Sequence, residues 1–147
     1  MSKHPLSKFI EGFHLHSYYA GINMAFAEVV GAGCKQLALS SPYSHEVAEQ
    51  MLPATESSAK EYNVKLMVEP GLLRSKLFPR DIAKDLTVIL IAHDQSVLDE
   101  YLTLKKLKET SDETGNPENL ELEIAQRFGA LLSYDEATIN RLIAKNG

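Results

Sequence analysis

Leu86–Ala92, with the sequence LTVILIA, is an unbroken run of seven uncharged residues that is rich in β-branched side chains. A half-exposed strand would alternate apolar and polar residues, so this run predicts a strand that is buried on both faces. Such a strand belongs at the centre of a sheet. Asp94 follows it closely and can cap a helix whose apolar residues include Leu98.

Shorter segments on the N-terminal side predict further strands and helices. Gly12–His16, Lys35–Leu39 and Val64–Val68 are expected to be strands. Helices are expected over Tyr18–Ala32 and over Ser44–Tyr62, the second kinked or divided by its internal proline. Strands that alternate with helices imply parallel pairing through right-handed crossovers. We therefore expect an α/β fold with a small parallel sheet of three to four strands and flanking helices.

The last third of the chain is predicted to be helical. A helix begins near Pro117, and Ser133 and Glu136 have the spacing of a capping box at the start of the final helix. Strand–helix units over residues 12–110 and a helical C-terminal segment over 116–146 together predict a single α/β domain over residues 1–147.

The composition argues against some classes of function. Of 147 residues, 44% are hydrophobic and 24% charged, with a net charge of −5, so no basic field steers the protein toward nucleic acid. Cys34 is the only cysteine, which leaves no intramolecular disulfide. Met1–Ile10 lacks an apolar stretch of signal-peptide length, and no run is long enough to span a bilayer. We expect a cytoplasmic protein with no nucleic-acid or membrane partner.

Polar residues follow the predicted strands, where α/β proteins bind their ligands. If the strands are parallel, their carboxyl ends meet at one edge of the sheet. The residues expected at that edge are His14, His16, Ser41, His45, Glu69 and His93.

The two early histidines predict a metal site. On a strand, His14 and His16 would project from the same side, and Glu69 could add a carboxylate. A mixed imidazole and carboxylate set suits a divalent Zn, Mn or Fe ion, which acidifies a bound water into a nucleophile. His93 or His45 would then act as the general acid or base. The alternative is that both early rings are partly exposed or hydrogen-bonded.

A small basic cluster predicts an anion site. Arg74 and Arg80, with Lys76 and Lys84 beside them, could hold a phosphorylated ligand, since arginine clamps such groups with two hydrogen bonds. Ser41 precedes a helix start, where backbone N–H groups also attract anions. The alternatives are a solvated loop for the basic cluster and an ordinary helix cap for the serine.

The stretch Phe13–Gly21 resembles the opening motif of the polymerase-and-histidinol-phosphatase (PHP) domain, in which a strand ends in His-x-His. The helix, turn and strand within Ala25–Leu39 are similar to those that follow in the family, and Glu69 stands at a corresponding place. The resemblance covers about the first half of the chain. It implies a metal-dependent phosphoesterase with His14, His16 and Glu69 at the metal.

Two features differ from that family. Ser41 and Pro42 stand where the family has an Asp-His pair. The chain is also shorter than the roughly 200 residues of a complete β/α barrel. Two functions therefore stay open: a metal-assisted hydrolase of a small phosphorylated molecule, or a non-catalytic module that binds a small ligand or pairs as a homodimer through its C-terminal helices.

Overall fold

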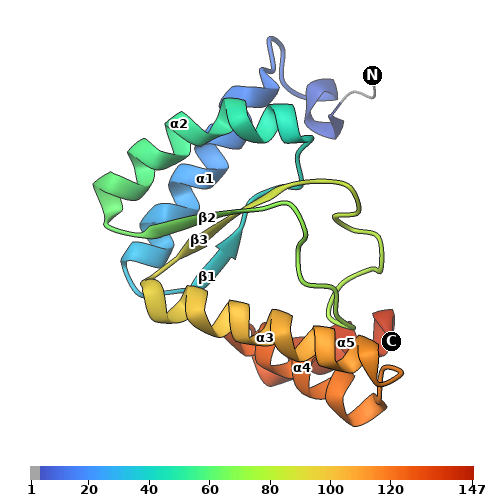
Figure 1. Ribbon diagram of the computed structural model, residues 1–147. Helices are drawn as coiled ribbons and strands as arrows, with labels where there is room; N and C mark the ends of the chain where they lie inside the picture. The colour runs from blue at the N-terminus through green and yellow to red at the C-terminus, as the bar shows by residue number, and fades with distance from the viewer. Residues whose placement is uncertain (1–3) are drawn as a thin grey trace.

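The computed structural model describes residues 4–147, so Met1–Lys3 of the N-terminal stretch lie outside the described residues. A three-stranded sheet lies between two layers of helices (Figure 1). No helix within residues 4–147 has the length and apolar character that crossing a membrane requires. In chain order the elements are η1 (Pro5–Lys8), α1 (Leu15–Gly31), β1 (Leu37–Leu39), α2 (His45–Tyr62), β2 (Lys65–Glu69), β3 (Val88–Ala92), α3 (Gln95–Glu113), α4 (Glu118–Leu131) and α5 (Glu136–Asn146).

The sheet is antiparallel, so the expectation of a parallel sheet is wrong. Its strand order is β1-β3-β2, and β3 runs antiparallel to both neighbours. Leu37 and Lys65 lie opposite Ala92 from the two sides, and Glu69 lies opposite Val88. β1 and β2 point in the same direction but are separated by β3. The prediction of a buried central strand in LTVILIA is confirmed for Val88–Ala92, all of which is buried, whereas Leu86 and Thr87 precede the strand.

The connections explain why the strand directions were mispredicted. β1 and β2 are joined by α2, a helical crossover of the kind that parallel strands require. Segment 70–87 joins β2 to β3 and contains no helix, and its internal Pro79 opposes one. Without a helical crossover, β3 returns beside β2 in the opposite direction.

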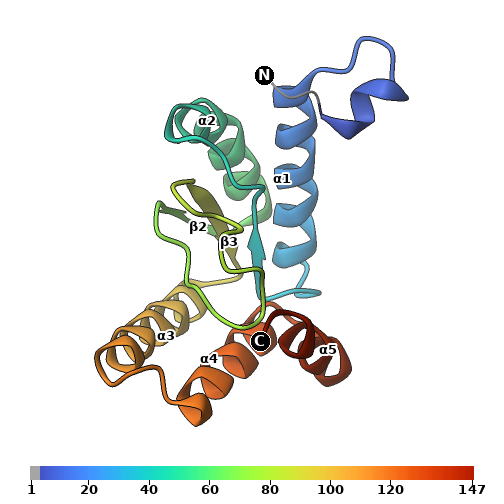
Figure 2. The ribbon, with the colours of Figure 1, turned by 90° about the vertical axis from the view of Figure 1, so that its right-hand side faces the viewer.

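Each face of the sheet supports one layer of helices (Figure 2). Ile89 and Ile91 of β3 pack against α1 and α2, where Ala27 and Val30 are fully buried. The alternate residues Val88, Leu90 and Ala92 face α3–α5 and form the larger core together with Tyr101, Leu104, Phe128 and Leu132. The expected helical C-terminal segment is present and closes this second face.

The predicted strand at Gly12–His16 is wrong. The backbone turns at Gly12, which has a φ of 72°, and α1 begins at Leu15. His14 is the N-cap of α1, because its ring nitrogen Nδ1 accepts a hydrogen bond from the Ser17 backbone N–H at 3.2 Å. A histidine thus takes the N-cap position, which serine, threonine, aspartate and asparagine fill more often. The short alternation of apolar residues and histidines reflects a helix start, and the sheet has three strands.

Several predicted helix ends are confirmed, and one is wrong. Asp94 caps α3, and α2 runs from its Ser44 cap as one continuous helix to Asn63, which takes a left-handed conformation. The proposed capping box at Ser133 is not formed, because Asp135 is the N-cap of α5. Ser133 instead accepts a hydrogen bond from the Gln36 backbone N–H at 3.0 Å, which ties the turn between α4 and α5 to the residue before β1.

Candidate ligand-binding site

The segment between β2 and β3 has the character of a functional loop. Loops of more than about 12–15 residues without helix or strand are uncommon in compact domains and commonly bind ligands. Segment 70–87 makes only one isolated bridge, from Thr87 to Tyr43. Its first half is anchored, since Leu73 and Leu77 are buried in the larger core. The stretch Pro79–Asp85 is mostly exposed.

A buried carboxylate fixes the start of this loop. The hydroxyl of Tyr101 donates to Glu69 Oε2 at 2.7 Å and accepts from the Leu73 backbone N–H at 2.9 Å. Lys105 Nζ lies 2.9 Å from Glu69 Oε2 and donates to the Gly71 carbonyl at 2.8 Å. The Gly71 N–H completes the set by donating to Glu69 Oε1 at 2.9 Å.

The surroundings of Tyr101 favour the protonated form of its phenol. Burial, with the bond to Glu69 as the second cause, raises the pKa of Tyr101 far above its ordinary value. Tyr101 therefore stays protonated at neutral pH and acts as a hydrogen-bond donor. Glu69, Tyr101 and Lys105 together act as a clamp that holds loop and helix at a fixed separation, and we call these three residues the Glu69 clamp.

A cavity of about 590 Å³ lies between this loop and α3. Its size falls within the range of ligand pockets, roughly 300–1,000 Å³. Apolar side chains and cations share its wall. The apolar residues are Leu72, Leu73, Phe78, Pro79, Ile82 and Ala83, the basic residues are Arg74, Arg80, Lys84, Lys105 and Lys108, and the acidic residues are Asp81, Asp85, Glu109 and Asp112.

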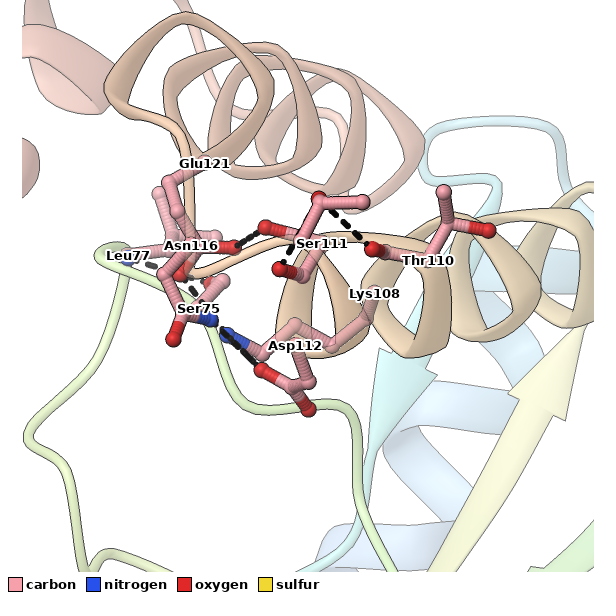
Figure 3. A network of polar contacts seen from close by, with 9 residues as sticks. Ser75, Leu77, Lys108, Thr110, Ser111, Asp112, Asn116 and Glu121 are labelled. Carbon is pink, nitrogen blue, oxygen red and sulfur yellow. Dashed lines mark hydrogen bonds and ion pairs between the residues drawn. The ribbon is translucent and has the colours of Figure 1, made fainter.

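A polar network supports the far wall of the cavity (Figure 3). Lys108 Nζ lies 2.7 Å from Glu121 Oε1 and 3.2 Å from Asp112 Oδ1. The buried hydroxyl of Ser111 donates to the other Glu121 oxygen at 2.7 Å, which joins α3 to α4. A hydrogen bond from Asn116, aided by Lys108, lowers the pKa of the Asp112 carboxyl. The wall is therefore held by charges that already neutralise one another.

The cations of the loop are arranged differently. Arg74, Arg80 and Lys84 form no ion pair within 4 Å among residues 4–147, although Arg74 is close enough to Asp112 to help lower its pKa. Arg74 and Arg80 also line a second hollow of about 280 Å³, which shares Phe78 with the first. The two arginines predicted to bind an anion thus both lie in the cavity wall.

Other predicted site residues lie elsewhere. The Ser41 carbonyl accepts a hydrogen bond from Ser40, and His45 is exposed at the start of α2 with Nε2 3.2 Å from Glu49 Oε1. His93 lies at the end of the sheet that is far from Glu69, because β3 runs antiparallel to β2. Its backbone N–H bonds to Gln36, just before β1. None of these three residues lines the cavity.

The predicted metal ligands do not converge. The rings of His14 and His16 have centroids 6.0 Å apart at the exposed start of α1. Glu69 directs its carboxylate toward α3, on the other face of the sheet, where Tyr101 and Lys105 bind one oxygen and the Gly71 N–H binds the other. Within residues 4–147 no three histidine, cysteine or acidic side chains are grouped as metal ligands. The set His14, His16 and Glu69 does not fit a shared ion, so a divalent metal stays a prediction of the sequence alone.

Sequence reasoning missed the contribution of α3. Lys105 and Lys108 were not among the predicted site residues, yet both line the cavity and their side chains are only 32% and 14% exposed. The spacing of Tyr101, Lys105, Lys108 and Asp112 places all four on one side of a helix, and that side continues from a buried aromatic residue. This periodicity is the signal that could have identified them.

Comparisons with protein-family models, with curated proteins and with solved structures give no match to this chain. What the protein binds is therefore inferred from its own residues.

Proposed function

We propose that this protein binds a small organic anion, a molecule with a phosphate or carboxylate group and an apolar body, in the cavity between segment 70–85 and α3. The main support is that Arg74, Arg80 and Lys84 face this region from the loop without an ion-pair partner among residues 4–147. A guanidinium group offers an anion two parallel hydrogen bonds, which are among the strongest in proteins.

The apolar part of the wall supports the second half of the proposal. Phe78 is half-buried, and Ile82 is 45% exposed beside it on the loop. A bound apolar group would cover such side chains, since burial of apolar surface contributes about 25 cal/mol per Å². An inorganic ion would leave them in water and should bind more weakly than an ester that carries a ring.

Binding is favoured over hydrolysis by the positions of the candidate catalytic groups. The predicted metal ligands are divided between the two faces of the sheet, and His93 lies at the far end. The Glu69 clamp also has a structural role that accounts for its buried carboxylate. Of the two functions left open by the sequence, a ligand-binding module agrees better with this arrangement.

The experiment is an NMR titration of the ¹⁵N-labelled protein with phenyl phosphate, phenol and benzylamine. We expect phenyl phosphate alone to shift amide signals in segments 71–85 and 105–112, and we expect its affinity to fall with added salt. The acidic residues Asp81, Asp85 and Glu109 also line the cavity. Benzylamine therefore tests whether the cavity prefers a cation to an anion. Saturable binding of benzylamine without phenyl phosphate binding would refute the proposal.

Paired variants locate the site. Arg80→Gln removes a cavity cation and should weaken phenyl phosphate binding about tenfold, the loss expected for one charge-assisted hydrogen bond. Arg141→Gln makes the same change on the exposed side of α5, away from the cavity, and should leave the affinity unchanged. Equal effects of both variants would mean that only net charge matters and that this cavity is not the site.

A further inference from the structure

Two hollows with different charges meet at Phe78. The first is the cavity described above, and the second shares Phe78, Arg74 and Arg80 with it. The second hollow is also lined by Lys76 of the loop and by part of the polar network that joins α3 to α4 (Figure 3). Lys76 lines only the second hollow. Three acidic residues line only the first: Asp81, Asp85 and Glu109.

The carboxylates of the second hollow are already bonded within the protein. Glu121 accepts hydrogen bonds from Lys108 at 2.7 Å and from Ser111 at 2.7 Å. Asp112 lies 3.2 Å from the same lysine nitrogen and accepts a hydrogen bond from Asn116 at 2.6 Å. Because both carboxylates already have donors, they repel an incoming anion less than free carboxylates would.

The loop side of the second hollow supplies free donors. The side chains of Arg74, Lys76 and Arg80 form no ion pair within 4 Å among residues 4–147. The Ser75 hydroxyl oxygen accepts a hydrogen bond from the Leu77 N–H at 3.1 Å, which leaves the hydroxyl proton able to donate. An anionic group in this hollow would therefore meet three cations and a hydroxyl donor.

The first cavity has no such excess of positive charge. Among residues 4–147, Lys84 is the one cation without an ion pair that lines this cavity and not the second hollow. Asp81, Asp85 and Glu109 line the same cavity and form no ion pair within the described part of the chain. These carboxylates would repel an anion and attract a protonated amine.

We propose that the ligand is a zwitterion that spans both hollows, an inference that rests on the function proposed above. Its anionic group lies in the second hollow between Arg74, Lys76 and Arg80. Its apolar middle covers Phe78, which is half-buried and lines both hollows. Its protonated amine lies near the free carboxylates of the first cavity. The opposite charges of the two hollows thus each find a counterpart in one molecule.

Two esters that differ in a single group test the proposal: tyramine O-phosphate and para-propylphenyl phosphate. They share the ring, the phosphate and the length of the side chain, but only the first ends in an ammonium group. In NMR titrations at neutral pH we expect the tyramine ester to bind about two- to fivefold more tightly, the upper range for a solvent-exposed ion pair. A site that responds only to net charge would give the opposite order, because the ammonium group makes the tyramine ester less negative.

A set of amide variants tests the cationic end of the ligand. Replacement of the three free carboxylates should abolish the preference for the tyramine ester and should not weaken para-propylphenyl phosphate. The substitutions are Asp81→Asn, Asp85→Asn and Glu109→Gln. A control variant removes three charges from exposed glutamates outside both hollows and should keep the preference. Its substitutions are Glu28→Gln, Glu56→Gln and Glu113→Gln.

The variant Lys76→Gln tests the anionic end. It removes the cation that lines only the second hollow and should weaken both esters about tenfold, the loss expected for one charge-assisted hydrogen bond. Lys60→Gln makes the same change on the exposed side of α2, across the sheet, and should leave both affinities unchanged.

The outcomes separate this inference from the function on which it rests. Equal binding of the two esters, tighter binding of para-propylphenyl phosphate, or a preference that survives the loss of the three carboxylates would each overturn the zwitterion and leave the anion site in place. Equal effects of Lys76→Gln and Lys60→Gln would show that the anionic group does not lie in the second hollow. Binding of neither ester would overturn both proposals.

Discussion

The hydroxyl of Tyr101 links three parts of the molecule: α3, the end of β2 and the loop that follows. It donates to the buried Glu69 carboxylate and accepts from the Leu73 N–H, so both sides of the hydroxyl are used. A buried polar group that loses its partner costs free energy, because water cannot replace the missing bond. The phenol therefore contributes more than the packing of its ring.

We expect Tyr101→Phe to lower the free energy of unfolding by about 1–3 kcal/mol, because Leu73 N–H loses its partner and Glu69 loses a donor. Urea denaturation measures this change. Tyr134→Phe is the control, since the Tyr134 hydroxyl makes no hydrogen bond among the described residues and should matter by only a few tenths of a kcal/mol. Similar losses in both variants would show that the hydroxyl of Tyr101 has no special role.

The carboxyl group of Asp94 makes the free energy of unfolding depend on pH in the acidic range. Hydrogen bonds from Ser96 and His93 lower the pKa of this carboxyl from 3.8 to about 2 in the folded protein. A lowered folded-state pKa stabilises the protein above the ordinary value of 3.8, and this stabilisation is lost as the pH falls toward about 2.

We therefore expect the free energy of unfolding to fall more steeply between pH 4 and pH 2 in the original protein than in Asp94→Asn. Asparagine can still cap α3 but does not titrate. Urea denaturation at a series of pH values measures both slopes. Identical slopes would mean that the carboxylate of Asp94 has the same affinity for protons in the folded and unfolded chain.

At the scale of single elements, the two glycines of α1 have different environments. A Cβ added to Gly31 would lie 2.5 Å from the backbone oxygen of Tyr62, at the end of α2. A Cβ added to Gly21 meets nothing within 4 Å. The first glycine permits two helices to approach, whereas the second only lowers helix propensity.

Gly31→Ala should lower the free energy of unfolding by about 1–3 kcal/mol, because a backbone carbonyl cannot move aside easily. Gly21→Ala should raise it by about 0.5–1 kcal/mol, the usual gain from alanine inside a helix. Thermal unfolding of the two variants measures both signs. A stabilising Gly31→Ala would contradict the close approach of α1 and α2.

Helices and strands could be predicted from the sequence wherever the signal comes from residues that are neighbours in the chain. The apolar run at Val88–Ala92 identified the central strand, and Asp94 and Ser44 identified helix starts, because a cap depends only on neighbouring residues. The direction of β3 depends on how segment 70–87 folds over α3, and no local pattern encodes that. His14 was misassigned because a histidine on a strand and a histidine that caps a helix look alike in sequence.

The same distinction applies to the candidate site. Arg74 and Arg80 were found because they form a basic cluster on one stretch of chain. Lys105 and Lys108 were missed because their place in the wall depends on which side of α3 faces the loop. The antiparallel direction of β3 also placed His93 at the far end of the sheet, away from the predicted edge.

At the scale of the whole molecule, β3 should be the last segment to exchange its amide hydrogens. Its residues are buried between two helical layers and bonded to strands on both sides. We expect Val88–Ala92 to exchange only through global unfolding, while Arg80–Lys84 exchange many times faster. Hydrogen exchange followed by NMR measures both. Comparable rates in the two segments would contradict the central position of β3.

The position of β3 has a consequence for biosynthesis. β1 and β2 make no ladder with each other and meet only through a strand that follows them in the chain. A nascent chain still tethered to the ribosome cannot complete its sheet until translation has passed Ala92 and that residue has left the exit tunnel. Until then the two earlier strands have unsatisfied edges, so emerging polypeptides would depend on chaperones for protection against aggregation.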